Sequence, residues 1–172
     1  MATPILNSNQ VGASAAANKV LQTNGSISTW TARAPITVYA AGTAYTLTNS
    51  SAALDFGTTD PVLTVNVAGT YLLLARVRVD LNAATFAANQ TLTLKLRRTN
   101  NTAADLTSGS TSYVIPIVTT ITQTLDIVEL PPVIYTTANA DDAVTIFGDL
   151  TVAPGAGTVT AVQAEIVAIR LY

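Results

Sequence analysis

Regular alternation of apolar and polar side chains is the feature that most constrains the fold of this chain. Between residues 71 and 81 every second side chain is apolar, and Leu92, Leu94 and Leu96 alternate with threonine, lysine and arginine. A period of two is typical of a strand that buries one face. A helical period occurs only over residues 14–21, a segment too short to be stable alone. The sequence therefore predicts an all-β fold.

Turn-forming residues divide the alternating pattern into separate strands. Ala68 and Gly69 predict a tight turn, so that residues 62–67 and 71–81 would form a hairpin. Pro116 predicts an edge or a bulge. The polar segment 99–111 is expected to be a loop, and the segment APGAGT (153–158) to be a hairpin loop. The other strands are expected at 90–98, 112–118, 122–130, 143–150 and 158–172.

The strand count and the absence of helical crossovers predict two packed antiparallel sheets. A single antiparallel β-sandwich, or jelly roll, is the natural arrangement for about eight short strands. Its expected extent is residues 34–172, and the 172-residue length suits one domain. Residues 1–33 have few large apolar side chains and are predicted to be an extended N-terminal arm.

Composition and charge exclude several classes of function. Only 10% of the residues are charged and the net charge is −2, so we expect no nucleic-acid binding, which needs clustered basic side chains. Arg76 with Arg78, and Lys95 with Arg97 and Arg98, alternate with apolar residues. We interpret them as solvated strand faces, with a subunit or receptor contact as the alternative. Threonine, serine, asparagine and alanine must cover most of the surface, and such a surface favours contact with other protein.

The residue types that carry most catalytic and metal-binding chemistry are missing. The chain has no histidine and no cysteine, which removes the usual base of a serine nucleophile and any thiolate metal site. Asp141 and Asp142 are adjacent and are not expected to act as a catalytic carboxylate pair. Together with Asn139 and Asp149 they form the best candidate for a calcium site, although their spacing matches no calcium-loop motif. We therefore expect no catalytic, cofactor-binding or metal-binding residues.

The sequence also bears on where the protein resides. It has no run of 18 apolar residues, so no membrane insertion is expected. The start MATPILNSNQ lacks the basic residues and apolar core of a secretory signal. We expect synthesis in the cytoplasm of a host cell.

Four features of residues 52–172 form a recognisable order: the Gly69-Thr70-Tyr71 turn before a long strand, then LTLKLRR, DDAVTIFGDL and EIVAIRLY. In this order the chain resembles the jelly-roll heads of the tumour necrosis factor and complement-head superfamily. The resemblance implies a compact homotrimer in which one sheet of each subunit packs around a threefold axis. The chain departs from that pattern in its few aromatic residues and in lacking the usual glycine of the final strand. Leu72 and Leu74 would supply the subunit contact, or would fill a second layer within one subunit.

The arm is similar to segments of bacteriophage tail-fibre, head-fibre and related virion proteins. In those proteins the segment precedes a β-structured tip, which implies that the arm anchors the protein to the particle. The alternative interpretation is a flexible linker of small residues. The matching anchor positions are Asn18, Lys19, Val20, Leu21, Gln22, Thr23, Asn24, Gly25 and Trp30.

These observations lead to one functional hypothesis and its alternatives. The chain is expected to be a non-enzymatic, trimeric capsid-decoration or head-fibre protein of a virion, bound to the capsid or another virion protein through its arm. A tail-borne tip that binds a host-surface receptor is one alternative. The others are an extracellular ligand-binding module of the complement-head type, and a carbohydrate-active enzyme that uses Asp141 or Asp142.

Overall fold

The computed structural model describes residues 19–23, 28–32, 35–81, 83–115 and 125–171. Within these ranges all regular secondary structure is β-strand, so the prediction of an all-β fold is confirmed. Within the described residues, no helix has the length and apolarity that a membrane crossing requires. The strands are β1 (Lys19–Thr23), β2 (Ser28–Ala32), β3 (Ile36–Thr46), β4 (Ala52–Ala53), β5 (Leu63–Thr64), β6 (Gly69–Asp80), β7 (Gln90–Arg98), β8 (Ala104–Ile115), β9 (Leu125–Thr137), β10 (Ala143–Leu150) and β11 (Thr160–Arg170).

The chain divides into two compact units, residues 1–35 and residues 36–172. In the first unit β1 and β2 pair antiparallel, with Thr23 opposite Ser28. Residues 19–21, the described part of the segment with a helical period, thus lie on a β-strand. Pairing with β2 gives the backbone of β1 hydrogen-bond partners that an isolated two-turn helix cannot secure.

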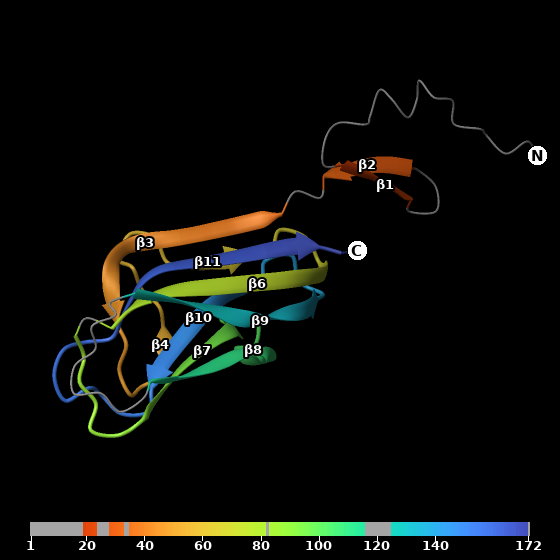
Figure 1. Ribbon diagram of the computed structural model, residues 1–172. Coiled ribbons are helices and arrows are strands. Elements are labelled where there is room, and N and C mark those ends of the chain that lie inside the picture. Colours follow the sequence, from red (N-terminus) through yellow and green to blue (C-terminus); the bar gives the residue numbers. More distant parts are fainter. Residues whose placement is uncertain (1–18, 24–27, 33–34, 82, 116–124, 172) are drawn as a thin grey trace, which may run out of the picture. The chain divides into compact units, whose positions relative to one another are not determined.

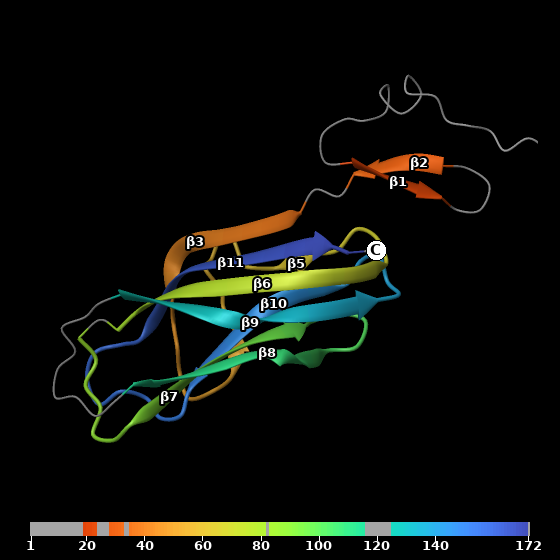
Figure 2. The same ribbon diagram turned by 45° about the vertical axis from the view of Figure 1, so that its right-hand side comes forward.

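The second unit is an antiparallel β-sandwich, which confirms the predicted jelly-roll class. One sheet has the order β3-β11-β6-β9. The other has the order β4-β10-β7-β8, and β5 also pairs with β10. Figures 1 and 2 show β11 between β3 and β6 in one layer, with β10, β7 and β8 in the layer behind it. We call these the β6 sheet and the β7 sheet.

The core lies between the two sheets and is made by the alternating positions. On β6 the predicted inward set, from Tyr71 to Val79 at every second residue, is buried. On β7 Leu92, Leu94 and Leu96 are buried opposite it, while Lys95 lies on the outward face. The facing that the period of two predicts is therefore confirmed for both strands. Burying these side chains between the sheets supplies most of the driving force for folding.

The hairpin predicted around Ala68 and Gly69 is wrong. Leu63 pairs with Val144 of β10 in the β7 sheet, whereas β6 pairs with β9 and β11 in the other sheet. The chain therefore crosses from one sheet to the other at residues 65–69. Both segments bury alternating side chains in the same core, but they do so from opposite sides.

Two segment boundaries also differ from the prediction. The polar loop is shorter than 99–111, because β8 already begins at Ala104 and pairs there with Arg98 of β7. Strand β9 continues past Leu130 to Thr137, with a register shift near Pro131 and Pro132 that this edge strand tolerates. The predicted edge or bulge at Pro116 lies outside the described residues.

The segment APGAGT is not a hairpin loop, because β10 and β11 belong to different sheets. Ala156 instead forms a bridge with Thr85, on the connection between β6 and β7. Gly157 has a φ of +71°, and a Cβ atom there would lie 2.8 Å from the backbone of Ala84. Glycine is therefore required for this close approach of two connections.

Candidate interaction surface on the β6 sheet

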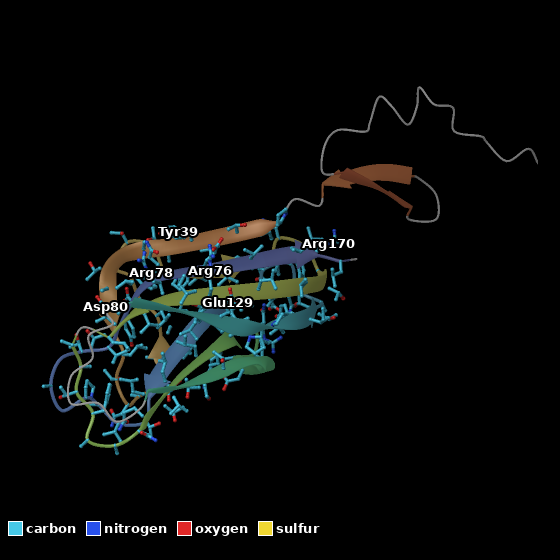
Figure 3. All side chains as sticks on the ribbon, in the orientation of Figure 1. Tyr39, Arg76, Arg78, Asp80, Glu129 and Arg170 are labelled. Carbon is cyan, nitrogen blue, oxygen red and sulfur yellow. The ribbon has the colours of Figure 1, made fainter. Side chains whose placement is uncertain are left out.

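The outward side of the β6 sheet collects exposed apolar and charged side chains in rows that run across the strands. We call this side the outer face. Figure 3 shows Tyr39, Arg76, Arg78 and Glu129 along it, on β3, β6 and β9. Because side chains that are paired across strands share a face, each row can be identified from the strand register.

The central row of the outer face carries alternating charges. Glu165 of β11 pairs with Tyr39 on one side and with Arg76 on the other, and Arg76 also pairs with Glu129 of β9. The Arg76 guanidinium contacts the Glu165 carboxylate at 2.6 Å. The Arg76 side chain is more than half exposed, so this ion pair contributes little to stability in the isolated chain.

Apolar side chains occupy the rows toward one end of the outer face. Leu72 pairs with Ile134 and Ile169, and Leu74 pairs with Val167. Leu74 is 37% exposed and Ile134 is 62% exposed. The predicted contact residues Leu72 and Leu74 thus lie together on one surface, and a role in subunit contact stays a prediction.

Two hollows lie on either side of the ion pair between Arg76 and Glu165. The first has a volume of about 490 Å³, and Tyr39, Arg78 and Ile127 line it together with that pair. The second has a volume of about 380 Å³ and is lined by the same pair together with Leu74, Glu129, Pro132 and Val167. The outer face is therefore concave in two places and also exposes apolar side chains, and a protein–protein contact can use both features.

The outward side of the β7 sheet has a different character. Lys95 contacts Asp105 at 2.9 Å, and Arg97 lies 3.6 Å from the same carboxylate. The Arg97 guanidinium also stacks 5.0 Å from the centre of the Phe147 ring. These basic side chains are thus satisfied within the chain, in agreement with their interpretation as a solvated strand face.

Asp142 is fully buried at the end of the sandwich, and its carboxylate is hydrogen-bonded by other side chains of the same chain. Tyr135 and Thr137 of β9 donate hydroxyl hydrogen bonds to it, Asn101 donates through its amide, and Arg98 of β7 lies 3.7 Å away. Burial alone would raise the pKa of Asp142, but these three hydrogen bonds and the nearby Arg98 charge lower it to about 2. Burial and the hydrogen bond to Asp142 raise the pKa of Tyr135.

Of the other residues proposed for a calcium site, Asn139 lies beside Asp142, but it donates its amide N–H to that carboxylate at 3.5 Å. Asp141 is exposed, and Asp149 lies at the opposite end of β10. Within the described part of the chain, no group of three or more acidic side chains is close enough to hold a metal ion. The arrangement around Asp142 ties together the ends of two sheets, which is a structural role.

The predicted anchor residues are only partly described. Lys19, Val20, Leu21 and Gln22 lie on β1, and Trp30 on β2 pairs with Leu21. Asn18, Asn24 and Gly25 lie outside the described residues. Their role in attachment stays a prediction.

Several residues of the outer face were not singled out from the sequence. They lie at outward positions of the other strands of the β6 sheet, and are Tyr39, Ile127, Glu129, Ile134 and Glu165. Alternation within residues 160–170 could have placed Glu165 on an exposed face. It could not have placed Glu165 beside Arg76, because the register between strands is not encoded in the period of either strand.

Comparison with known proteins adds evidence on the fold. No family model matches the sequence, and a search of curated proteins finds no relative. Among solved structures the chain is similar to a chain of infectious bursal disease virus strain Gx, with a TM-score of 0.50 and 6% sequence identity over 88% of this chain and 36% of that chain. A chain of the T13 particle of infectious bursal disease virus aligns with a TM-score of 0.47 and 8% identity, over 88% of this chain and 35% of its own.

A chain of Desmodium yellow mottle tymovirus gives a TM-score of 0.28 and 12% identity, over 80% of this chain and 87% of that chain. The present chain spans about a third of the length of the two bursal disease virus chains. At such low sequence identity the likeness to strain Gx shows a shared β-sandwich fold.

Proposed function

We propose that this chain is a non-enzymatic structural protein of a virus particle. More narrowly, we propose a homotrimeric capsid-decoration or head-fibre protein of a bacteriophage, made in the host cytoplasm and located in the virion. Residues 1–33 would attach it to the capsid or to another virion protein. The observation that carries the proposal is the β-sandwich of residues 36–172, whose fold is shared with a chain of a virus particle.

Two further observations support a structural role. The anchor segment of residues 18–30 is similar to segments that precede the tips of phage fibre proteins. The outer face exposes Leu74 and Ile134 beside partly exposed Leu72, and burial of such side chains on association contributes roughly 25 cal/mol per Å² of apolar surface. On this proposal the protein acts by binding alone.

The chemistry of the acidic residues is in keeping with that role. Asp142 has a lowered pKa, and its carboxylate already accepts hydrogen bonds from Tyr135, Thr137 and Asn101. A general base or a nucleophile needs an oxygen that can reach a substrate, and this carboxylate is fully buried. Its contacts stabilise the fold.

Attachment through the arm is tested by comparing the full chain with a variant that lacks residues 1–33. Each is produced with an affinity tag during infection by the virus that encodes the chain, and particles are purified by density-gradient sedimentation. We expect the full chain to sediment with particles and the truncated chain to stay in the soluble fraction. Thermal unfolding of the truncated chain serves as the control for folding.

Particles that contain the truncated chain at the level of the full chain would contradict the anchor role. Absence of the full chain from purified particles would contradict the virion role itself. The two outcomes are therefore separable in one experiment.

A further inference from the structure

Two opposite charges on the outer face, Arg78 and Glu129, have no ion-pair partner among the described side chains. Among the described side chains, neither the Arg78 guanidinium nor the Glu129 carboxylate has an oppositely charged group within ion-pair distance. The neighbouring Arg76 is already paired with Glu165. Among the described residues of the central row and of the adjacent row that contains Arg78, the outer face therefore presents one cation and one anion without an ion-pair partner.

The surroundings of these two charges differ from open surface. Arg78 lines the hollow with Tyr39 and Ile127, which are 58% and 57% exposed. Glu129 lines the adjacent hollow. An ion pair formed where such apolar side chains exclude water is stronger than one in open solvent, and it fixes the register of a contact.

We propose that the outer face binds the outer face of neighbouring copies of this chain, and that Glu129 of one copy pairs with Arg78 of the next. The inference rests on the proposed homotrimer and names the charges that set its register. A second copy is the occupant that fits, because the surface is complementary to itself. In the row of Arg76 and the adjacent row of Arg78, these two arginines balance Glu129 and Glu165, and the apolar rows around Leu74 supply a contact of the same kind on both sides.

The contrast with the other sheet strengthens the assignment. On the outward side of the β7 sheet, Lys95 and Arg97 share Asp105 within the chain, and the described side chains there leave no such complementary pair. Of the two sheets, the β6 sheet is thus the one whose described charges can form ion pairs with a second copy of the chain.

Charge reversal in the full-length chain tests the proposal. The variants are Arg78→Glu, Glu129→Arg and the double variant that carries both changes, and self-association is measured by light scattering over a dilution series. Each single reversal brings like charges together and should raise the concentration for half-association by about tenfold or more. The double variant restores opposite charges across the contact and should associate nearly as the unmodified chain does. An equimolar mixture of the two single variants should recover only part of the association, because a ring of three always joins two copies of the same variant.

Lys95→Glu, on the β7 sheet, is the matched control and should leave self-association unchanged. Should a reversal lower the melting temperature, the milder Arg78→Gln and Glu129→Gln replace it, each with a smaller weakening expected. The proposal is overturned if the unmodified chain is monomeric, if single reversals associate normally, or if the double variant is as weak as the singles. Sedimentation with particles is a separate readout, so failure of attachment through the arm would leave this result interpretable.

Discussion

Asp142 contacts side chains from the ends of both sheets. Tyr135 and Thr137 reach it from β9 in the β6 sheet, and Arg98 reaches it from β7 in the other sheet. A buried carboxylate that accepts several hydrogen bonds is costly to leave unpaired and stabilising when it is satisfied. The structural role of Asp142 could not be predicted from the sequence, because all of its partners are distant in sequence or lie beyond a turn.

We predict that Asp142→Asn lowers the free energy of unfolding by about 2–4 kcal/mol, because an amide group would face hydroxyl and amide donors. The exposed neighbour offers a matched control, and Asp141→Asn should change stability by less than about 0.5 kcal/mol. Urea unfolding at neutral pH measures both. Equal losses in the two variants would contradict the structural role of Asp142.

The pH dependence of stability follows from the same residue. Its pKa is about 2 in the folded protein against an ordinary value of 3.8, so the ionised form stabilises the fold. The contribution of about 2 kcal/mol is fully present above about pH 5 and is lost as the pH falls through about 2. Asp142→Asn should lack this part of the acid destabilisation, which urea unfolding at a series of pH values between 2 and 6 would detect.

At the scale of elements, strand β7 tests the facing that the period of two predicts. Leu94 is fully buried, whereas Lys95 is directed outward and contacts Asp105. We predict that Leu94→Asp prevents folding, because it buries an unpaired charge, and that Lys95→Asp leaves the protein folded. Circular dichroism and thermal unfolding of the two variants measure the difference. Similar damage from both would contradict the assigned facing.

The same strands show how far the sequence could predict the architecture. Alternation correctly separated the buried positions of β6 and β7 from the exposed ones, because burial depends on local periodicity. It failed for the partner of residues 62–67, because Leu63 and Thr64 of this segment pair with β10 instead of β6. Pairing depends on contacts between residues far apart in sequence, and two strands of opposite sheets have the same alternation when they share a core.

The whole molecule combines a folded β-sandwich with a separate unit that contains the β1–β2 pair. Predicting the sandwich class needed only strand count and periodicity. The outer face could be predicted only in part. Leu72 and Leu74 were found from their position in one strand, but Arg78 and Glu129 come together only once the order β6-β9 is known. The proposed structural role in a virion therefore depends on the outer face, whose residues come from strands that are distant in sequence.

The measurement that most directly tests this account is the mass of the full-length chain in solution, by size-exclusion chromatography coupled to light scattering. The proposed homotrimer predicts a mass of three times the 17.8 kDa of one chain. A mass of one chain at all concentrations measured would contradict it.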